Sequence, residues 1–95
     1  MLKIINPELL AIQTRFFEAL DLLIRTGQIT GVRQFCEKHG LNRVKYLNIR
    51  KSIRNPEIQN TIHYKVIDLD ALAYLCQDYH ISSDWLLLGK GEMFK

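Results

Sequence analysis

The feature that most constrains the fold is a pair of short amphipathic patterns on either side of Gly40. Two short helices that cross closely need a small residue at the crossing, a glycine that tolerates a positive φ angle, and apolar residues beneath the turn. Cys36 is the small residue and Gly40 is the turn residue. The apolar layer consists of Phe35, Leu41, Tyr46 and Ile49. The stretch from 32 to 49 therefore predicts two helices that meet at about a right angle through a tight turn.

Helical spacing of apolar residues predicts a longer helix before this pair, from Pro7 to Thr26. Asn6 is suited to cap its first turn, and Gly27 is suited to stop it. Thr30 and Asn42 have side chains that cap helices, so we expect them to begin the second and third helices.

Two further helices are predicted after residue 67. We expect Asp68 to cap the first of them, whose apolar side consists of Leu69, Leu72, Ala73, Leu75, Cys76 and Tyr79. Ser82 is expected to cap the last helix, from Ser83 to Leu88, which buries Trp85 and Leu86.

An apparent insertion separates the third helix from the fourth, at about residues 56–67. The third helix closes at Asn55-Pro56, because proline disfavours a helical residue before it. Residues 58–67 are β-branched, aromatic or polar, with Ile58, Ile62, Tyr64 and Val66 on alternate positions. This pattern is typical of an extended loop or an edge strand.

The five helical patterns predict an all-α fold, and the length and composition favour a single domain spanning 1–95. A chain of 95 residues with 47% apolar and 24% charged residues has the composition of an ordinary folded domain with one core. No stretch approaches the roughly 20 apolar residues that span a bilayer, and the first residues lack the pattern of a secretory signal. Two cysteines are too few for a disulfide framework, so we expect a cytoplasmic protein with reduced thiols.

Basic residues are concentrated in one part of the chain. Residues 33–65 hold eight Lys and Arg against two Asp and Glu, whereas the remainder holds five against eight. A basic block within a folded segment predicts an anionic partner that meets one face, although a solvated surface is the plain alternative.

The paired helices and the end of the chain together resemble the lambda-repressor-like helix-turn-helix DNA-binding domain of phage-repressor-like bacterial regulators. The motif lies at about 31–51, and the end, with Trp85 followed by leucines and Gly89, is similar to the tryptophan-leucine-glycine signature that closes such domains. The chain departs from the family at Val32, where a glutamine is common, and in its insertion. The resemblance implies a five-helix domain and a cytoplasmic transcriptional regulator, a repressor that binds double-stranded DNA as a homodimer without a cofactor.

The resemblance also implies a recognition helix at about 42–51 that enters the major groove. At about 100° per residue, the side opposite Tyr46 and Ile49 carries Val44, Leu47, Asn48 and Lys51, flanked by Arg43 and Lys45. Asparagine is suited to adenine, arginine and lysine to guanine or phosphate, and aliphatic side chains to thymine methyl groups. Further candidates for phosphate contacts are Thr30, Arg33, Arg50 and Arg54.

Two alternatives stay open at this point. Val44 and Leu47 are equally suited to pack on the insertion or on a partner. The chain is therefore alternatively a protein-interaction or antitoxin-like module that keeps the fold without specific DNA binding. The insertion has two possible roles as well. Lys65 and His63 are suited to contact the DNA backbone, whereas Ile62, Tyr64 and Val66 are suited to pair with a second chain.

Candidate metal and catalytic groups are weak by comparison. Cys36 with His39, and Cys76 with His80, have helical spacing that suits zinc, but Cys36 is already required at the helix crossing. No third group orients either pair as a nucleophile, and no acidic pair is recognisable as a catalytic dyad. We therefore expect no metal, no small-molecule substrate and no enzymatic activity.

Overall fold

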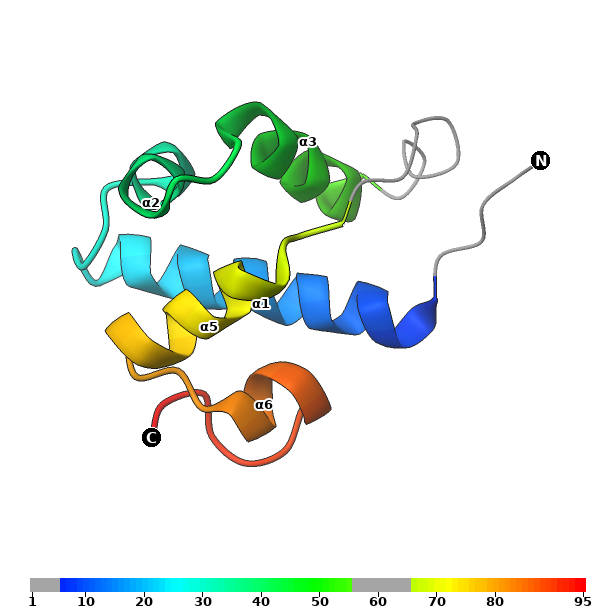
Figure 1. The fold of residues 1–95 in the computed structure, drawn as a ribbon. Helices are drawn as coiled ribbons and strands as arrows, with labels where there is room; N and C mark the ends of the chain where they lie inside the picture. The colour runs from blue at the N-terminus through cyan, green and yellow to red at the C-terminus, as the bar shows by residue number, and fades with distance from the viewer. Residues whose placement is uncertain (1–5, 56–65) are drawn as a thin grey trace.

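The computed structural model describes residues 6–55 and 66–95, which form five helices joined by short connections (Figure 1). They are α1 (Pro7–Arg25), α2 (Val32–His39), α3 (Arg43–Arg54), α5 (Leu69–Asp78) and α6 (Ser83–Leu88). These two ranges contain no strand, only an isolated antiparallel bridge between Ile81 and Phe94. The predicted all-α class is therefore confirmed. Most of the extended stretch predicted at 58–67 lies outside the described residues, and Val66 and Ile67 are not in a strand.

α1 is the central helix of the molecule. α2 and α3 lie on one side of it and α6 on the other, while α5 crosses in front of it (Figure 1). Phe16 is fully buried on α1, and its ring centroid lies 5.9 Å from those of Phe35 on α2 and Tyr46 on α3. Leu20 and Leu23 continue the same buried side of α1. The predicted apolar side of the first helix thus forms the centre of the core.

α1 is also the longest of the described helices, at 19 residues. Neither it nor any other helix in 6–55 and 66–95 combines the length and the apolar character needed to cross a lipid bilayer.

Three of the predicted helix caps are confirmed. Asn6, Asn42 and Ser82 each accept a hydrogen bond from a backbone N–H two or three residues farther along the chain. These bonds satisfy N–H groups that have no partner within the first turn of a helix. The caps therefore fix where α1, α3 and α6 begin.

Two predicted caps are wrong, and the predicted apolar side of α5 is correct for Leu72, Leu75, Cys76 and Tyr79 only. Thr30 does not cap α2, because the capping position is held by Gly31; the Thr30 N–H and hydroxyl instead both donate to Oε1 of Gln34. Asp68 precedes α5, but its carboxylate makes no cap bond and binds side chains of α3 instead. Leu69, expected on the apolar side of α5, is 86% exposed, and Ala73 is exposed as well.

The turn between α2 and α3 has the predicted conformation. Gly40 adopts the left-handed region, with φ 68° and ψ 30°, where a residue without a Cβ avoids strain. Its N–H and that of Leu41 both donate to the carbonyl oxygen of Cys36, which is fully buried. Three residues, 40–42, therefore suffice to redirect the chain from α2 into α3.

The first and last helices are joined by one arginine. Arg15 on α1 donates from Nε to the carbonyl oxygen of Leu86 at 2.8 Å and from Nη2 to that of Leu87 at 3.1 Å. These carbonyls belong to the last turn of α6, where a positive charge is favourable. Leu86 is buried, as predicted, whereas Trp85 is only half-buried.

Candidate nucleic-acid interface

α3 has a buried side and an exposed side. Tyr46 and Ile49 point into the core, with 0% and 4% of their surface exposed. The opposite side is exposed to solvent, and we call it the outer face of α3; it consists of Arg43, Val44, Leu47, Asn48 and Lys51. The helical-wheel prediction for this helix is confirmed.

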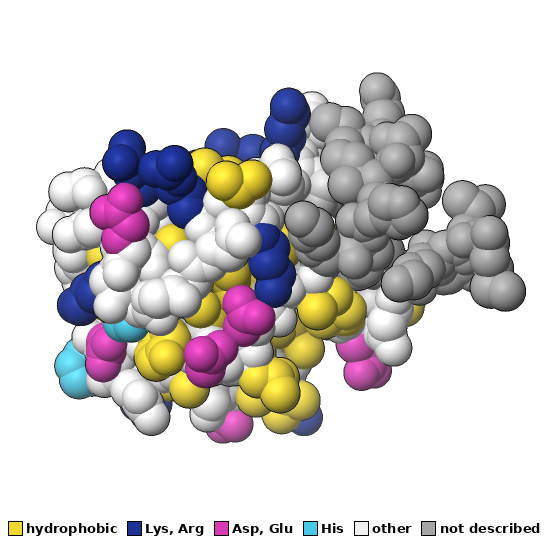
Figure 2. All heavy atoms as spheres, turned by 45° about the horizontal axis from the view of Figure 1, so that its top comes forward, with side chains coloured by type: hydrophobic (Ala, Val, Ile, Leu, Met, Phe, Trp, Pro, Cys, Tyr) yellow, Lys and Arg dark blue, Asp and Glu magenta, His cyan; other side chains and the backbone are white. Residues whose placement is uncertain are grey.

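Positive charge gathers around this part of the molecule. Figure 2 shows Lys and Arg side chains over α2 and α3, with hydrophobic side chains exposed between them. The exposed hydrophobic residues that α3 contributes are Val44 and Leu47. A surface of this kind combines attraction for an anion with apolar contact area.

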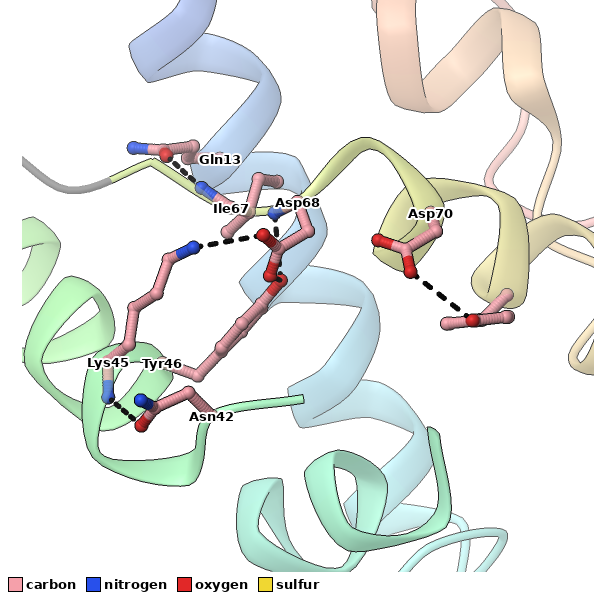
Figure 3. A network of polar contacts seen from close by, with 8 residues as sticks. Gln13, Asn42, Lys45, Tyr46, Ile67, Asp68 and Asp70 are labelled. Carbon is pink, nitrogen blue, oxygen red and sulfur yellow. Dashed lines mark hydrogen bonds and ion pairs between the residues drawn. The ribbon is translucent and has the colours of Figure 1, made fainter. Parts of the chain in front are cut away.

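A network around Asp68 fixes the N-terminal half of α3 (Figure 3). Nζ of Lys45 donates to Oδ1 of Asp68 at 3.0 Å, and the Tyr46 hydroxyl donates to Oδ2 at 2.7 Å. The N–H of Asp68 donates back to the Tyr46 hydroxyl at 2.9 Å. On the other side, the N–H of Ile67 donates to Oε1 of Gln13 at 3.0 Å. The segment 67–68 therefore ties α3 to α1.

The same network determines two protonation states. The hydrogen bond from the Tyr46 hydroxyl, followed by the one from Lys45, lowers the pKa of Asp68. Burial is the largest cause that raises the pKa of Tyr46. Near neutral pH, Asp68 is therefore a carboxylate and Tyr46 a neutral phenol, as the direction of their hydrogen bonds requires.

A second carboxylate holds the C-terminal half of α3. Asp21 on α1 accepts from Nη2 of Arg50 at 2.6 Å and from Nη2 of Arg54 at 3.1 Å. Arg50 is half-buried and Arg54 is exposed. One acid on α1 thus neutralises part of the positive charge at this end of α3.

Eight of the ten predicted contact residues have polar side chains, and these fall into two groups; the other two are the aliphatic Val44 and Leu47. The polar side chains on the outer face have no hydrogen-bond or ion-pair partner among residues 6–55 and 66–95; they are Arg43, Asn48 and Lys51. The side chains that already have partners are Thr30, Arg33, Lys45, Arg50 and Arg54. Arg33 bonds to Glu37 at 2.9 Å in an exposed pair, which water and salt weaken.

The structure corrects the expected environment of Lys45 and Arg50. We expected Lys45 to flank the outward side and Arg50 to border the groove, but both are half-buried and turned toward carboxylates. Their partners, Asp68 and Asp21, were missed because one has the sequence signature of a cap and the other that of a surface acid. Lys45 and Arg50 each stand next to a buried residue of α3, which indicated that their side chains are partly buried. The sequence did not indicate which acid each of them would bind.

His39, the last residue of α2, packs against residues of α5 and the segment that follows it. Its ring stacks on Tyr74 with centroids 4.5 Å apart and lies 4.7 Å from the ring of Phe35. Its Nε2 is 3.4 Å from the Tyr79 hydroxyl and 3.7 Å from a carboxylate oxygen of Asp78. Burial is the main cause that lowers the pKa of His39, against the opposing effect of Asp78. The imidazole is therefore neutral near neutral pH and serves as part of the packing.

The cysteine at the helix crossing, Cys36, is a buried and protonated thiol. Burial raises the pKa of Cys36 to about 11, so its thiol is protonated near neutral pH. In the part of the chain that the structure describes, no group of three or more His, Cys, Asp or Glu side chains is placed to hold a metal ion.

No match to this chain was found among protein-family models, curated proteins or solved structures.

Proposed function

We propose that this chain binds double-stranded DNA sequence-specifically and acts as a transcriptional regulator of the lambda-repressor-like, phage-repressor kind. In this proposal α3 lies in the major groove as the recognition helix. Two copies bind the halves of an inverted repeat, whose centres lie about 34 Å apart. The single observation that supports this function most directly is the outer face of α3, where three polar side chains have no partner within the described chain.

The side chains on this face have the chemistry that duplex recognition needs. The major groove is about 12 Å wide and admits an α-helix. Asn48 is suited to a bidentate contact with adenine, while Arg43 and Lys51 are suited to guanine or phosphate. The inner side of α3 is held by Asp68 and Asp21, so the helix meets the groove as a fixed element. A fixed element loses little conformational entropy on binding.

The internal ion pairs also limit how strongly binding depends on salt. Each phosphate that a cation neutralises contributes about −0.9 to the slope of log K against log salt. If only Arg43 and Lys51 are available, we expect a slope of about −1.8 per copy. The eight bases between 33 and 65 would imply a much steeper slope if all of them met phosphate.

Fluorescence titration of the chain against a labelled random-sequence duplex at low salt tests the proposal. The double variant Arg43→Ala with Lys51→Ala should weaken binding at least about tenfold, since binding to a random sequence at low salt depends on cations that neutralise phosphates. The matched control is Lys90→Ala with Lys95→Ala, which removes the same charge from the C-terminal end, on the far side of α1 from α3 (Figure 1). Equal loss in both double variants would mean that net charge alone drives binding.

The second candidate is a protein-interaction or antitoxin-like module. The exposed Val44 and Leu47 favour it, because solvent-exposed aliphatic residues on a helix often mark a protein contact. Failure of the wild-type chain to bind any duplex at low salt would support this candidate and reject the first.

A further inference from the structure

Two aliphatic side chains on the outer face of α3 lie outside the buried core of the described residues. Val44 is 58% exposed and Leu47 is 42% exposed, whereas Ile49 on the same helix is almost fully buried. They are three residues apart, so they lie on the same side of the helix. Arg43 and Lys51 flank them. The pair therefore forms a small apolar centre between two cations that have no ion-pair partner within residues 6–55 and 66–95.

We propose that Val44 and Leu47 contact the 5-methyl groups of thymine on neighbouring base pairs, so that the chain discriminates thymine from uracil at those positions. This inference rests on the proposed function. Among the base edges in the major groove, thymine presents a methyl group where the others present polar donors and acceptors. An apolar centre flanked by cations is complementary to a methyl group on the groove floor between two phosphate strands.

The distance between Val44 and Leu47 along the helix axis is close to the distance between neighbouring base pairs. Three residues of an α-helix rise about 4.5 Å. Successive base pairs are about 3.4 Å apart, so two side chains at this spacing reach adjacent or nearly adjacent steps. Val44 lies in the first turn of α3, the part of a recognition helix that comes closest to the base edges.

The inference separates DNA from RNA as a partner. The major groove of an RNA duplex is deep and narrow, so a helix cannot read base edges there, and uracil has no 5-methyl group. A duplex of DNA with thymine is therefore the ligand that satisfies both the cations and the aliphatic pair.

The test begins with selection of bound duplexes from a random 20-base-pair pool by the full chain; that pool length is about two helical turns. The most enriched duplex is then synthesised with deoxyuridine in place of each thymidine in turn, and binding is measured by fluorescence anisotropy. At one or two positions per half-site, we expect the loss of a methyl group to weaken binding about fourfold, the ratio that corresponds to one buried methylene-sized group.

Variants assign the effect to the two side chains. Val44→Ala and Leu47→Ala should each abolish the thymine preference at one position. A double-mutant cycle that combines each alanine variant with each uracil substitution measures the coupling energy between that side chain and that methyl group. Leu88→Ala is the matched control, because Leu88 is a 63% exposed leucine on α6. It should leave the preference unchanged. Circular dichroism melting checks that all three variants fold.

Each outcome decides the inference. If the wild-type chain binds the enriched duplex and every uracil substitution is neutral, or if the preference survives in both alanine variants, the methyl-contact inference is wrong while the proposed function stands. If no duplex is bound, the proposed function fails and the inference fails with it. The aliphatic pair is then assigned to a protein partner.

Discussion

The replacement Tyr46→Phe tests whether the Asp68 network holds α3 in place. The change removes one hydroxyl from a fully buried ring and leaves the apolar packing with Phe16 intact. That hydroxyl donates to the Asp68 carboxylate and accepts from the Asp68 N–H. The variant therefore breaks two hydrogen bonds and leaves one backbone donor without its partner.

The expected cost follows from these two bonds. A hydrogen bond to a charged group contributes about 1.5–3 kcal/mol, and a buried donor left without a partner costs about 1–3 kcal/mol. The Asp68 side chain is 41% exposed, so water replaces part of what the carboxylate loses. We expect the free energy of unfolding to fall by about 2 kcal/mol, which lowers Tm by roughly 10 °C in a domain of this size.

Urea denaturation at pH 7 measures this loss, and Tyr74→Phe is the matched control. The Tyr74 hydroxyl also donates to an aspartate, Asp70, but at 3.3 Å and in an exposed position. Its removal should change stability by less than about 0.5 kcal/mol. If Tyr46→Phe costs no more than Tyr74→Phe, the network does not hold α3 as argued.

Two further predictions concern charge and pH. The variant Asp21→Asn releases Arg50 and Arg54, so the slope of log K against log salt for duplex binding should become steeper by up to about 1.8. The free energy of unfolding should change by no more than about 1 kcal/mol. An unchanged slope would contradict the role given to Asp21. Burial lowers the pKa of His39 in the folded state, so the unfolded chain takes up the proton first. The stability that depends on neutral His39 is complete above about pH 6.5 and is lost as pH falls toward the folded-state pKa. As the pH is lowered from about 6.5 to 5, the urea midpoint of His39→Phe should therefore fall less than that of the wild type. If the two midpoints fall equally with pH, His39 is not the source of the pH dependence.

The helices could be predicted from local patterns because local physics determines them. Asn42 caps α3 through a bond to an N–H three residues away, and Gly40 supplies the left-handed residue that ends α2. Thr30 failed as a cap because α2 begins one residue later than its pattern suggested, with Gly31 at the capping position. Local patterns thus identify candidates for each cap, but they do not decide at which of two neighbouring residues a helix begins.

The candidate site was predictable only in part. The wheel of α3 correctly separated Tyr46 and Ile49 from the exposed side. It could not show that Lys45 binds an acid 23 residues away or that Arg50 binds one 29 residues away. Pairing over such distances depends on how the helices pack, and that information is not contained in the period of one helix.

The contact between Arg15 and the end of α6 bears on how the chain folds during synthesis. The guanidinium and its acceptor on Leu86 are 71 residues apart, yet they join the first helix to the last. At about 5–20 residues per second, a ribosome needs roughly 4–14 seconds to add that length. During this interval α6 is not yet available to pack against α1. The nascent chain therefore exposes part of the apolar surface of α1 to chaperones and proteases until α6 has been synthesised.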